Sequence, residues 1–153
     1  MISVEKFTQD RIGAVLEFEA ELRRQEPDTF FADAGENYRA RLERSFEDGR
    51  FTNAVSLLAW EDGRVIGRID AVILAARSDA NCVTAYLDWI CVLKEARHRG
   101  VAQRLLAELR RELKGRGVET LIAVMAHNPE SVRFYKAVEK ASIHDEAVWM
   151  DLR

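Results

Sequence analysis

Apolar residues recur every three to four positions in two polar stretches near the start of the chain. This spacing places them on one face of an amphipathic helix. They are Ile12, Val15, Leu16 and Leu22 in the first stretch and, beyond a break near Pro27 and Gly35, Tyr38, Leu42 and Phe46 in the second. We therefore predict two helices here, preceded by a first strand over Ile2 to Phe7.

The middle of the chain carries longer apolar runs that are rich in β-branched residues and typical of strands. We predict strands over Ala54 to Trp60, Val65 to Ala76 and Val83 to Leu93. The first two are joined by Glu61-Asp62-Gly63-Arg64, in which Asp-Gly supplies the positive φ of a tight hairpin turn. This pair of strands is therefore expected to be antiparallel.

A helix and a further strand follow. The leucine-rich segment Val101 to Leu113 has helical spacing, and Gly115 and Gly117 are expected to end it. Val118 to Ala126 is almost continuously apolar, as expected of a strand that is covered on both faces. A strand, a helix and a strand in this order suggest a parallel crossover.

Two more elements are predicted near the end of the chain. Asn128-Pro129 opens another helix, because asparagine is a favoured N-cap and proline loses no needed hydrogen bond at the first helical position. The segment Glu146 to Leu152 alternates like a strand. The elements together predict an α/β (mixed α+β) fold, in which helices flank a mixed, mainly antiparallel sheet with one parallel strand-helix-strand unit.

Composition and charge bound the class of protein. With 153 residues, 48% of them hydrophobic, the chain fits a single domain over residues 1–153 with one core. Its apolar runs fall far short of the roughly 18 residues of a membrane span, and its first residues lack signal-peptide features, so we expect a cytoplasmic protein. A formal net charge of −3 argues against nucleic acid or a membrane as partner. Cys82 and Cys91 lack zinc-site spacing and are expected to be free thiols.

Arginines and a glycine lie where the strand ending near Leu93 passes into the next helix, in Arg97-His98-Arg99-Gly100-Val101-Ala102. The first turn of a helix has unpaired N–H groups and a positive dipole end, so it favours an anion such as phosphate. Gly100 and Ala102 are small enough to let a pyrophosphate approach the backbone, while Arg97 and Arg99 can add charge-assisted hydrogen bonds. A solvated helix start with incidental arginines is the alternative, and the local sequence leaves both open.

The wider context resembles the acetyl-CoA-binding motif of the GNAT superfamily of N-acetyltransferases. The resemblance rests on Ile90-Cys91-Val92, the five-residue step to Arg97, the Arg-x-x-Gly-x-Ala pattern and the leucine-rich helix. It continues into Asn128 to Tyr135, which is similar to the family's second motif, an asparagine followed seven residues later by a tyrosine. The resemblance implies a GNAT-like domain that passes the acetyl group of acetyl-CoA directly to a primary amine, with the strand-helix-strand unit binding the cofactor.

Carried over residue by residue, the resemblance implies specific roles. Backbone groups of Ile90, Cys91 and Val92 would pair with the pantetheine arm and the thioester, and an N–H near Val92 would polarise the carbonyl. Asn128 would contact the cofactor, and Tyr135 would protonate the departing thiolate, although a core tyrosine is the alternative reading of that residue. The pyrophosphate would be held by the N–H groups of Arg97, His98, Arg99, Gly100, Val101 and Ala102.

The sequence departs from the family pattern in three places. Many relatives have proline at Lys94 and Gly-Phe at Glu139-Lys140, so the helix exit is expected to differ here. Some protein-N-terminus acetylases of the family have an acid where this chain has Ala123. That acid is therefore missing as a general base.

Asp88 and Tyr86 are the best remaining candidates for the general base. They share strand parity with Ile90 and Val92, and strict alternation would put all four on one face. A solvated or ion-paired Asp88 and a water relay stay open as alternatives.

Other classes of function are weighed against transfer. A non-catalytic acyl-CoA-binding or regulatory domain is the main alternative, and a nucleotide-binding module lacks a complete Walker loop and a dinucleotide fingerprint. The three histidines lack metal-ligand spacing, so no metal is predicted, and Cys91 in an apolar strand is expected to be an inert thiol. The acceptor, a small-molecule or protein amine, is not specified by the sequence, and a homodimer is left open.

Overall fold

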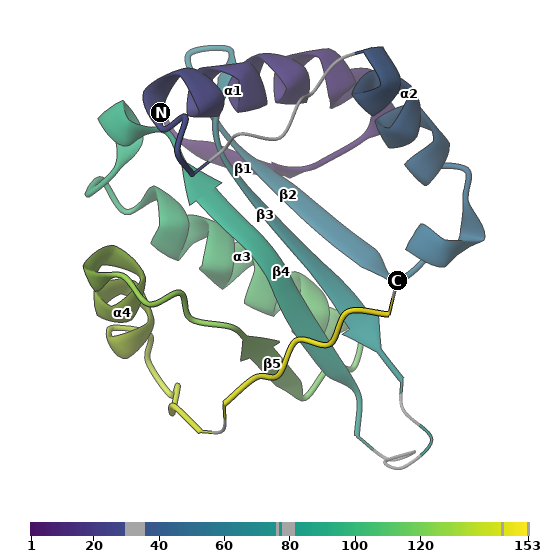
Figure 1. Ribbon diagram of the computed structural model, residues 1–153, viewed down its shortest axis with the longest axis vertical. Coiled ribbons are helices and arrows are strands. Elements are labelled where there is room, and N and C mark those ends of the chain that lie inside the picture. The colour runs from purple at the N-terminus through teal and green to yellow at the C-terminus, as the bar shows by residue number, and fades with distance from the viewer. Residues whose placement is uncertain (30–35, 76, 78–81, 145, 153) are drawn as a thin grey trace. The chain divides into compact units, whose positions relative to one another are not determined.

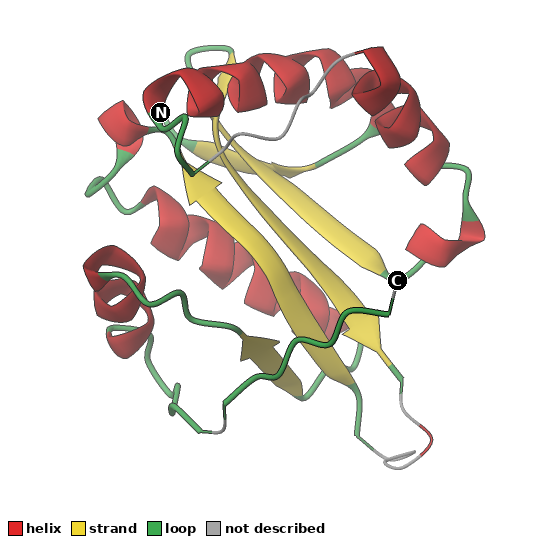
Figure 2. Ribbon diagram, in the orientation of Figure 1, coloured by secondary structure: helices red, strands yellow, loops and turns green. Residues whose placement is uncertain are grey.

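A computed structural model describes residues 1–29, 36–75, 77, 82–144 and 146–152. The predicted break at Gly35 and the predicted strand end at Ala76 lie outside these residues. The chain divides into two compact units, Met1–Ile122 and Ala123–Arg153, and each is described by itself. Figure 1 labels the elements along the chain and Figure 2 separates helices from strands. The helices and strands are β1 (Ser3–Lys6), α1 (Ile12–Gln25), α2 (Glu36–Ser45), β2 (Ala54–Glu61), β3 (Arg64–Leu74), β4 (Thr84–Val92), α3 (Val101–Gly115), β5 (Thr120–Ala123) and α4 (Pro129–Lys136), with short 3-10 turns at Gln9–Arg11, Gly49–Phe51 and Lys94–Ala96.

The strands form one sheet in the order β1-β2-β3-β4-β5. Neighbours from β1 to β4 are antiparallel, and β5 follows the α3 crossover parallel to β4. The β2–β3 turn has positive φ at Asp62 (50°) and Gly63 (79°), as a type I′ hairpin requires. The mixed, mainly antiparallel sheet and its hairpin are therefore as predicted.

The two faces of the sheet are covered by different helices. At Gly67 the missing Cβ would point at Leu105 and Val101 of α3. The next residue along β3, Arg68, reaches Glu19 of α1 with its guanidinium. Because successive residues of a strand point to opposite faces, α3 packs on one face of the sheet and α1 on the other. The core lies in both layers, with Leu105 and Leu109 of α3 and Val15 and Leu22 of α1 almost fully buried.

Gly67 is where α3 approaches the sheet most closely. A Cβ there would lie 3.1 Å from Leu105 Cδ1 and 3.2 Å from the backbone oxygen of Cys91, which cannot move aside without moving β4. We expect Gly67→Ala to lower the free energy of unfolding by about 1–3 kcal/mol, as overpacked sites do. Urea denaturation checks this value. Gly13→Ala in α1 is the matched control, because nothing lies within 4 Å of its Cβ position and no loss is expected; equal stability of both variants would contradict the close packing.

The end of the sheet differs from the prediction. The predicted strand over 118–126 is reduced to the four residues of β5, and Ile122 within it is 51% exposed. This exposure shows that β5 is not covered on both faces, contrary to the prediction. In the described sheet β5 is an edge strand, with β4 as its neighbour. The predicted strand over 146–152 is wrong: these residues are described and have no strand or helix assignment. Alternation alone does not make a strand, because its backbone groups need a hydrogen-bonded neighbour.

The second unit, Ala123–Arg153, contains α4. Its N-cap is Asn128, whose side-chain oxygen accepts a hydrogen bond from the Ser131 N–H at 2.8 Å, and Pro129 occupies the first turn. The predicted asparagine-proline helix start is therefore confirmed. None of the helices in the described part of the chain combines the length and the apolar composition needed to cross a bilayer.

Candidate cofactor-binding and active site

The connection from β4 to α3 ends at Gly100, beside the first N–H groups of the helix. After Leu93 the chain makes a 3-10 turn, in which the Ala96 N–H donates to Leu93 O at 2.9 Å. Positive φ at His98 (58°) and Gly100 (78°) then directs the backbone into α3. The Arg104 N–H donates to Gly100 O at 3.0 Å, so the amides of residues 101–103 precede the first hydrogen bond of the helix. These amides and the helix dipole favour an anion at this end of α3.

The backbone at Gly100 is open to the approach of a ligand. Nothing lies within 4 Å of the position that a Cβ would occupy there. Its φ of 78° is left-handed, a conformation that glycine adopts without the steric cost paid by other residues. Gly100 therefore serves both the turn and the approach of a ligand to the backbone.

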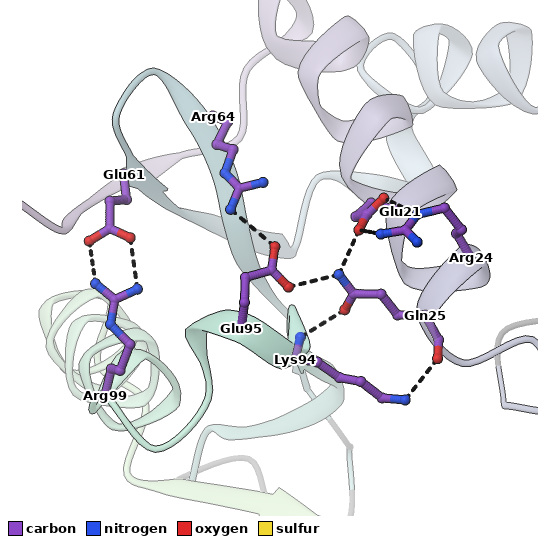
Figure 3. Close-up of polar contacts among 8 residues, drawn as sticks. All are labelled: Glu21, Arg24, Gln25, Glu61, Arg64, Lys94, Glu95 and Arg99. Atoms are coloured by element: carbon purple, nitrogen blue, oxygen red, sulfur yellow. Dashed lines mark hydrogen bonds and ion pairs between the residues drawn. The ribbon is translucent and has the colours of Figure 1, made fainter.

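The two arginines of this segment are bonded to carboxylates of the protein. Arg99 makes two parallel hydrogen bonds to Glu61 in the β2–β3 hairpin, at 2.9 and 2.6 Å (Figure 3). Arg97 pairs with Glu26 just after α1, at 2.5 Å, and its Nε donates to Val92 O at 3.0 Å. Hydrogen bonds from these arginines lower the pKa of Glu61 and Glu26. In this structure the guanidiniums thus anchor the connection to the fold. The sequence left open whether these arginines bond a phosphate or are incidental to a solvated helix start.

Gln25, at the end of α1, ties the same connection from another side (Figure 3). Its side-chain oxygen accepts from the Lys94 N–H at 2.8 Å, and its Nε2 donates to Glu95 at 2.7 Å. Arg64 of the hairpin also donates to Glu95, at 3.0 Å. These contacts hold the connection between α1 and the hairpin, so its backbone shape is set before any ligand binds.

The hydrogen-bond pattern of β4 determines which of its backbone groups face outward. The Leu93 N–H donates to Ile66 O at 3.0 Å, which makes these residues a hydrogen-bonded pair with β3. In an antiparallel ladder, hydrogen-bonded and non-hydrogen-bonded pairs alternate. The backbone N–H and C=O of Cys91, which is opposite Arg68, therefore also point toward β3. The N–H and C=O groups of Ile90 and Val92 point to the other edge of β4. Among the residues predicted to pair with a pantetheine arm, Ile90 and Val92 therefore present their backbone outward and Cys91 does not.

β5 reaches only part of that outer edge. It starts beside the beginning of β4, where the Glu119 N–H donates to Val83 O at 2.9 Å, and it is four residues long. Two parallel strands advance by nearly equal steps, so β5 ends about level with Asp88. The outward backbone groups of Ile90 and Val92 lie beyond it, on the approach to the α3 N-terminus.

β4 contains a bulge at Asp88. Asp70 of β3 is opposite Trp89, whereas the next residue, Ala71, is opposite Leu87, so Asp88 is the extra residue. Opposite residues share a face, and Tyr86 is opposite Val72, on the face of Asp70 and Arg68. Ile90 and Val92, opposite Ile69 and Gly67, are on the α3 face. The prediction that Tyr86 shares a face with Ile90 and Val92 is therefore wrong, because the bulge reverses the alternation between them.

The remaining candidates differ in their surroundings. Asp88 and His98 are exposed, so solvent and ligands can reach them. Cys91 is buried, and burial raises the pKa of its thiol to about 12, which keeps it protonated and unreactive at neutral pH. In the second unit, the ring of Tyr135 packs edge-on against Phe134, with centroids 5.1 Å apart, and the oxygen of Asn128 is engaged by its helix cap.

A comparison with protein-family models identifies the family of the chain. The sequence matches the model of the Acetyltransferase (GNAT) family over residues 16–138. No curated protein matches the sequence. An aminoglycoside acetyltransferase from an uncultured soil metagenomic sample aligns with a TM-score of 0.79 at 19% identity, covering 100% of this chain and 98% of that one.

Two further solved structures are similar over nearly their whole length. AAC(6')-Iy, in complex with the bisubstrate analog CoA-S-monomethyl-acetylneamine, has a TM-score of 0.74 at 19% identity, with 99% and 98% covered. The ribosomal-protein-alanine N-acetyltransferase from Brucella melitensis biovar Abortus 2308 has a TM-score of 0.73 at 16% identity, with 99% of each chain covered. At these identities the likeness shows a shared fold.

Proposed function

The chain belongs to the Acetyltransferase (GNAT) family, and from this premise we propose that it moves the acetyl group of acetyl-CoA to a primary amine. The family match supports the acetyl transfer. The dependence on acetyl-CoA and the amine acceptor are our proposal. The match spans residues 16–138 and so includes parts of both compact units, which supports a single catalytic domain over residues 1–153.

One observation carries the proposal: the backbone groups of Ile90 and the N–H of Val92 point to the outer edge at the end of β4, and the amides of residues 101–103 at the start of α3 precede the first hydrogen bond of that helix. The Val92 oxygen accepts from Arg97 Nε. An extended pantetheine arm can add to a strand edge as a β-strand would, by pairing with such groups. A pyrophosphate suits the helix N-terminus that follows, and Gly100 leaves the approach to these amides open. The fit is to backbone atoms, since Arg97 and Arg99 are bonded to Glu26 and Glu61.

Acetyl-CoA would supply the activated acyl group as a thioester. In the proposed reaction the amine nitrogen bonds to the acetyl carbon, the C–S bond breaks, the ammonium proton passes to a base and the thiolate takes a proton. The Val92 N–H is proposed to polarise the carbonyl, a contribution typically worth about 10²–10³ in rate. Asp88, exposed at the bulge, is the proposed general base, directly or through water. Tyr135 is the proposed proton donor to the thiolate.

The acceptor is proposed to be a small-molecule or protein amine. The similar structures include aminoglycoside acetyltransferases, one of them in complex with sisomicin, and a ribosomal-protein-alanine N-acetyltransferase. Both kinds of acceptor carry primary amines. The cytoplasmic location and a homodimer stay predictions.

An acceptor screen tests this function. The full chain is mixed with acetyl-CoA and a panel holding sisomicin, neamine, polyamines, amino acids and a peptide with an N-terminal alanine, and free coenzyme A is detected by its thiol. We expect release of coenzyme A that depends on both enzyme and amine, with the acetylated amine seen by mass spectrometry. Tight acetyl-CoA binding without release for any amine would instead indicate a non-catalytic acyl-CoA-binding domain.

A further inference from the structure

A charged cluster lies inside the sheet–α1 layer, away from the β4–α3 connection. Arg68 of β3 and Glu19 of α1 are each only 8% exposed. Arg68 Nη1 donates to Glu19 Oε1 at 2.7 Å. Its Nη2 donates to Asp70 Oδ1 at 3.1 Å, and Nε lies 2.7 Å from Asp70 Oδ2 without the alignment of a hydrogen bond. We call Glu19, Arg68 and Asp70 the buried triad.

Stability alone does not account for the buried triad. Burial disfavours the charged forms of these groups, and it raises the pKa of Glu19. Burial also acts to lower the pKa of Arg68, but the negative charges of Asp70 and Glu19 outweigh this effect, so the pKa of Arg68 is raised. Such groups gain little over apolar residues of the same shape, because desolvation offsets their attraction. A chain that only needed a stable core could place apolar side chains here.

The buried triad lies against the functional half of β4. Arg68 is opposite Cys91, and Asp70 is opposite Trp89. Trp89 directly follows the bulged residue Asp88 in β4. The Arg68 guanidinium is also 5.5 Å from the centre of the Trp89 ring, at cation–π distance. The triad thus contacts β4 between the exposed Asp88 and the outward backbone of Val92.

We propose that Arg68 is a positioning residue for acetyl transfer, which fixes the bulge of β4 through its pairs with Glu19 and Asp70 and its contact with Trp89. The inference rests on the proposed function, because it assigns the purpose of the bulge to the transfer reaction. A bulge interrupts the ladder, so its geometry depends on the side chains packed beside it. Here the fork of Arg68 links α1, β3 and β4 at one point. A rigid bulge holds Asp88 and the Val92 N–H at a constant separation.

A charge-balanced variant separates positioning from stability. In Glu19→Gln/Arg68→Met/Asp70→Asn all three charges are replaced by neutral groups of similar size, so no buried charge is left unpaired. We expect a melting temperature close to that of the wild type, because removing the desolvation penalty of three charges offsets the loss of their mutual attraction. We expect acetyl-CoA affinity to be unchanged and kcat to fall by about 10- to 10²-fold, since small misplacements of reacting groups cost that much.

Hydrogen exchange supplies a readout that does not depend on turnover. Amides of residues 87–92 should exchange faster in the triple variant, while those of α3 should keep their protection. If the triple variant does not fold, Arg68→Lys takes its place, because lysine keeps the charge but lacks the planar guanidinium. It should also lower kcat and speed the exchange of residues 87–92, each by less than in the triple variant. Arg111→Met, which removes an 81% exposed arginine side chain on α3, should change neither.

The outcomes are distinguishable. A folded triple variant, or Arg68→Lys in its place, with wild-type kcat and wild-type exchange over residues 87–92 would overturn the positioning role. A wild-type chain that neither binds acetyl-CoA nor releases coenzyme A would overturn the proposed function. In that case faster exchange over residues 87–92 in the triple variant would still support the inference that Arg68 fixes the bulge of β4. Unchanged exchange would refute it.

Discussion

Gly100→Glu is expected to weaken acetyl-CoA binding by at least about 10²-fold. The new carboxylate would lie at the amides that start α3, where the pyrophosphate is proposed to bind, and like charges in contact cost several kcal/mol. Calorimetric titration with acetyl-CoA measures the loss. The fold should survive, because nothing lies within 4 Å of the Cβ position.

Backbone strain must be separated from charge in this experiment. Gly100 has a φ of 78°, so any L side chain there costs roughly 1–2 kcal/mol in the folded state. Gly100→Ala carries the same strain without the charge, and Gly100→Asn tolerates the left-handed region better. We expect both to bind acetyl-CoA far more tightly than Gly100→Glu. Equal affinity of the Glu and Ala variants would show that the phosphate binds elsewhere.

Tyr135→Phe is expected to lower kcat by about 10²-fold or more while leaving acetyl-CoA affinity nearly unchanged. A proton donor to the leaving thiolate acts in the transition state, so its loss appears in turnover and not in ground-state binding. Phenylalanine keeps the ring that packs against Phe134. Steady-state kinetics with the best acceptor and an acetyl-CoA titration measure the two effects.

Tyr38→Phe is the matched control for Tyr135→Phe. The Tyr38 hydroxyl donates to Glu19 at 2.8 Å, and burial together with Glu19 raises its pKa to about 12, so at neutral pH it stays protonated and bonded to Glu19. Its removal should cost about 0.5–1.5 kcal/mol of stability. It should lower turnover far less than Tyr135→Phe, because Glu19 keeps its hydrogen bond from Arg68. A stable Tyr135→Phe variant with the turnover of the wild type would leave another group or solvent to protonate coenzyme A.

Local signals predicted the elements that hold the candidate site. The Asp62-Gly63 turn, the leucine-rich α3 and the Asn128 cap each depend on residues close in sequence, and the structure has all three. Spacing and turn chemistry determine such features before any tertiary contact forms. That the turn at Gly100 binds an anion stays a prediction.

Long-range partners could not be predicted. Glu61 and Glu26 are 38 and 71 residues from the arginines that they bind, and nothing in the sequence links them. The bulge at Asp88 was missed because one inserted residue does not change the composition of an apolar run. Its effect is large, since it places Tyr86 and Ile90 on opposite faces of the sheet. The strand expected over 146–152 was wrong because alternation was read without a partner strand.

Titration of the wild-type chain with acetyl-CoA, followed by calorimetry and by the melting temperature, tests the central claim most directly. Binding to the native state alone stabilises it by mass action, by about 2.7 kcal/mol when the ligand is at 100 times its Kd. We predict saturable heat of binding at one site and a melting temperature that rises with acetyl-CoA concentration. Absence of both at millimolar acetyl-CoA would contradict the account.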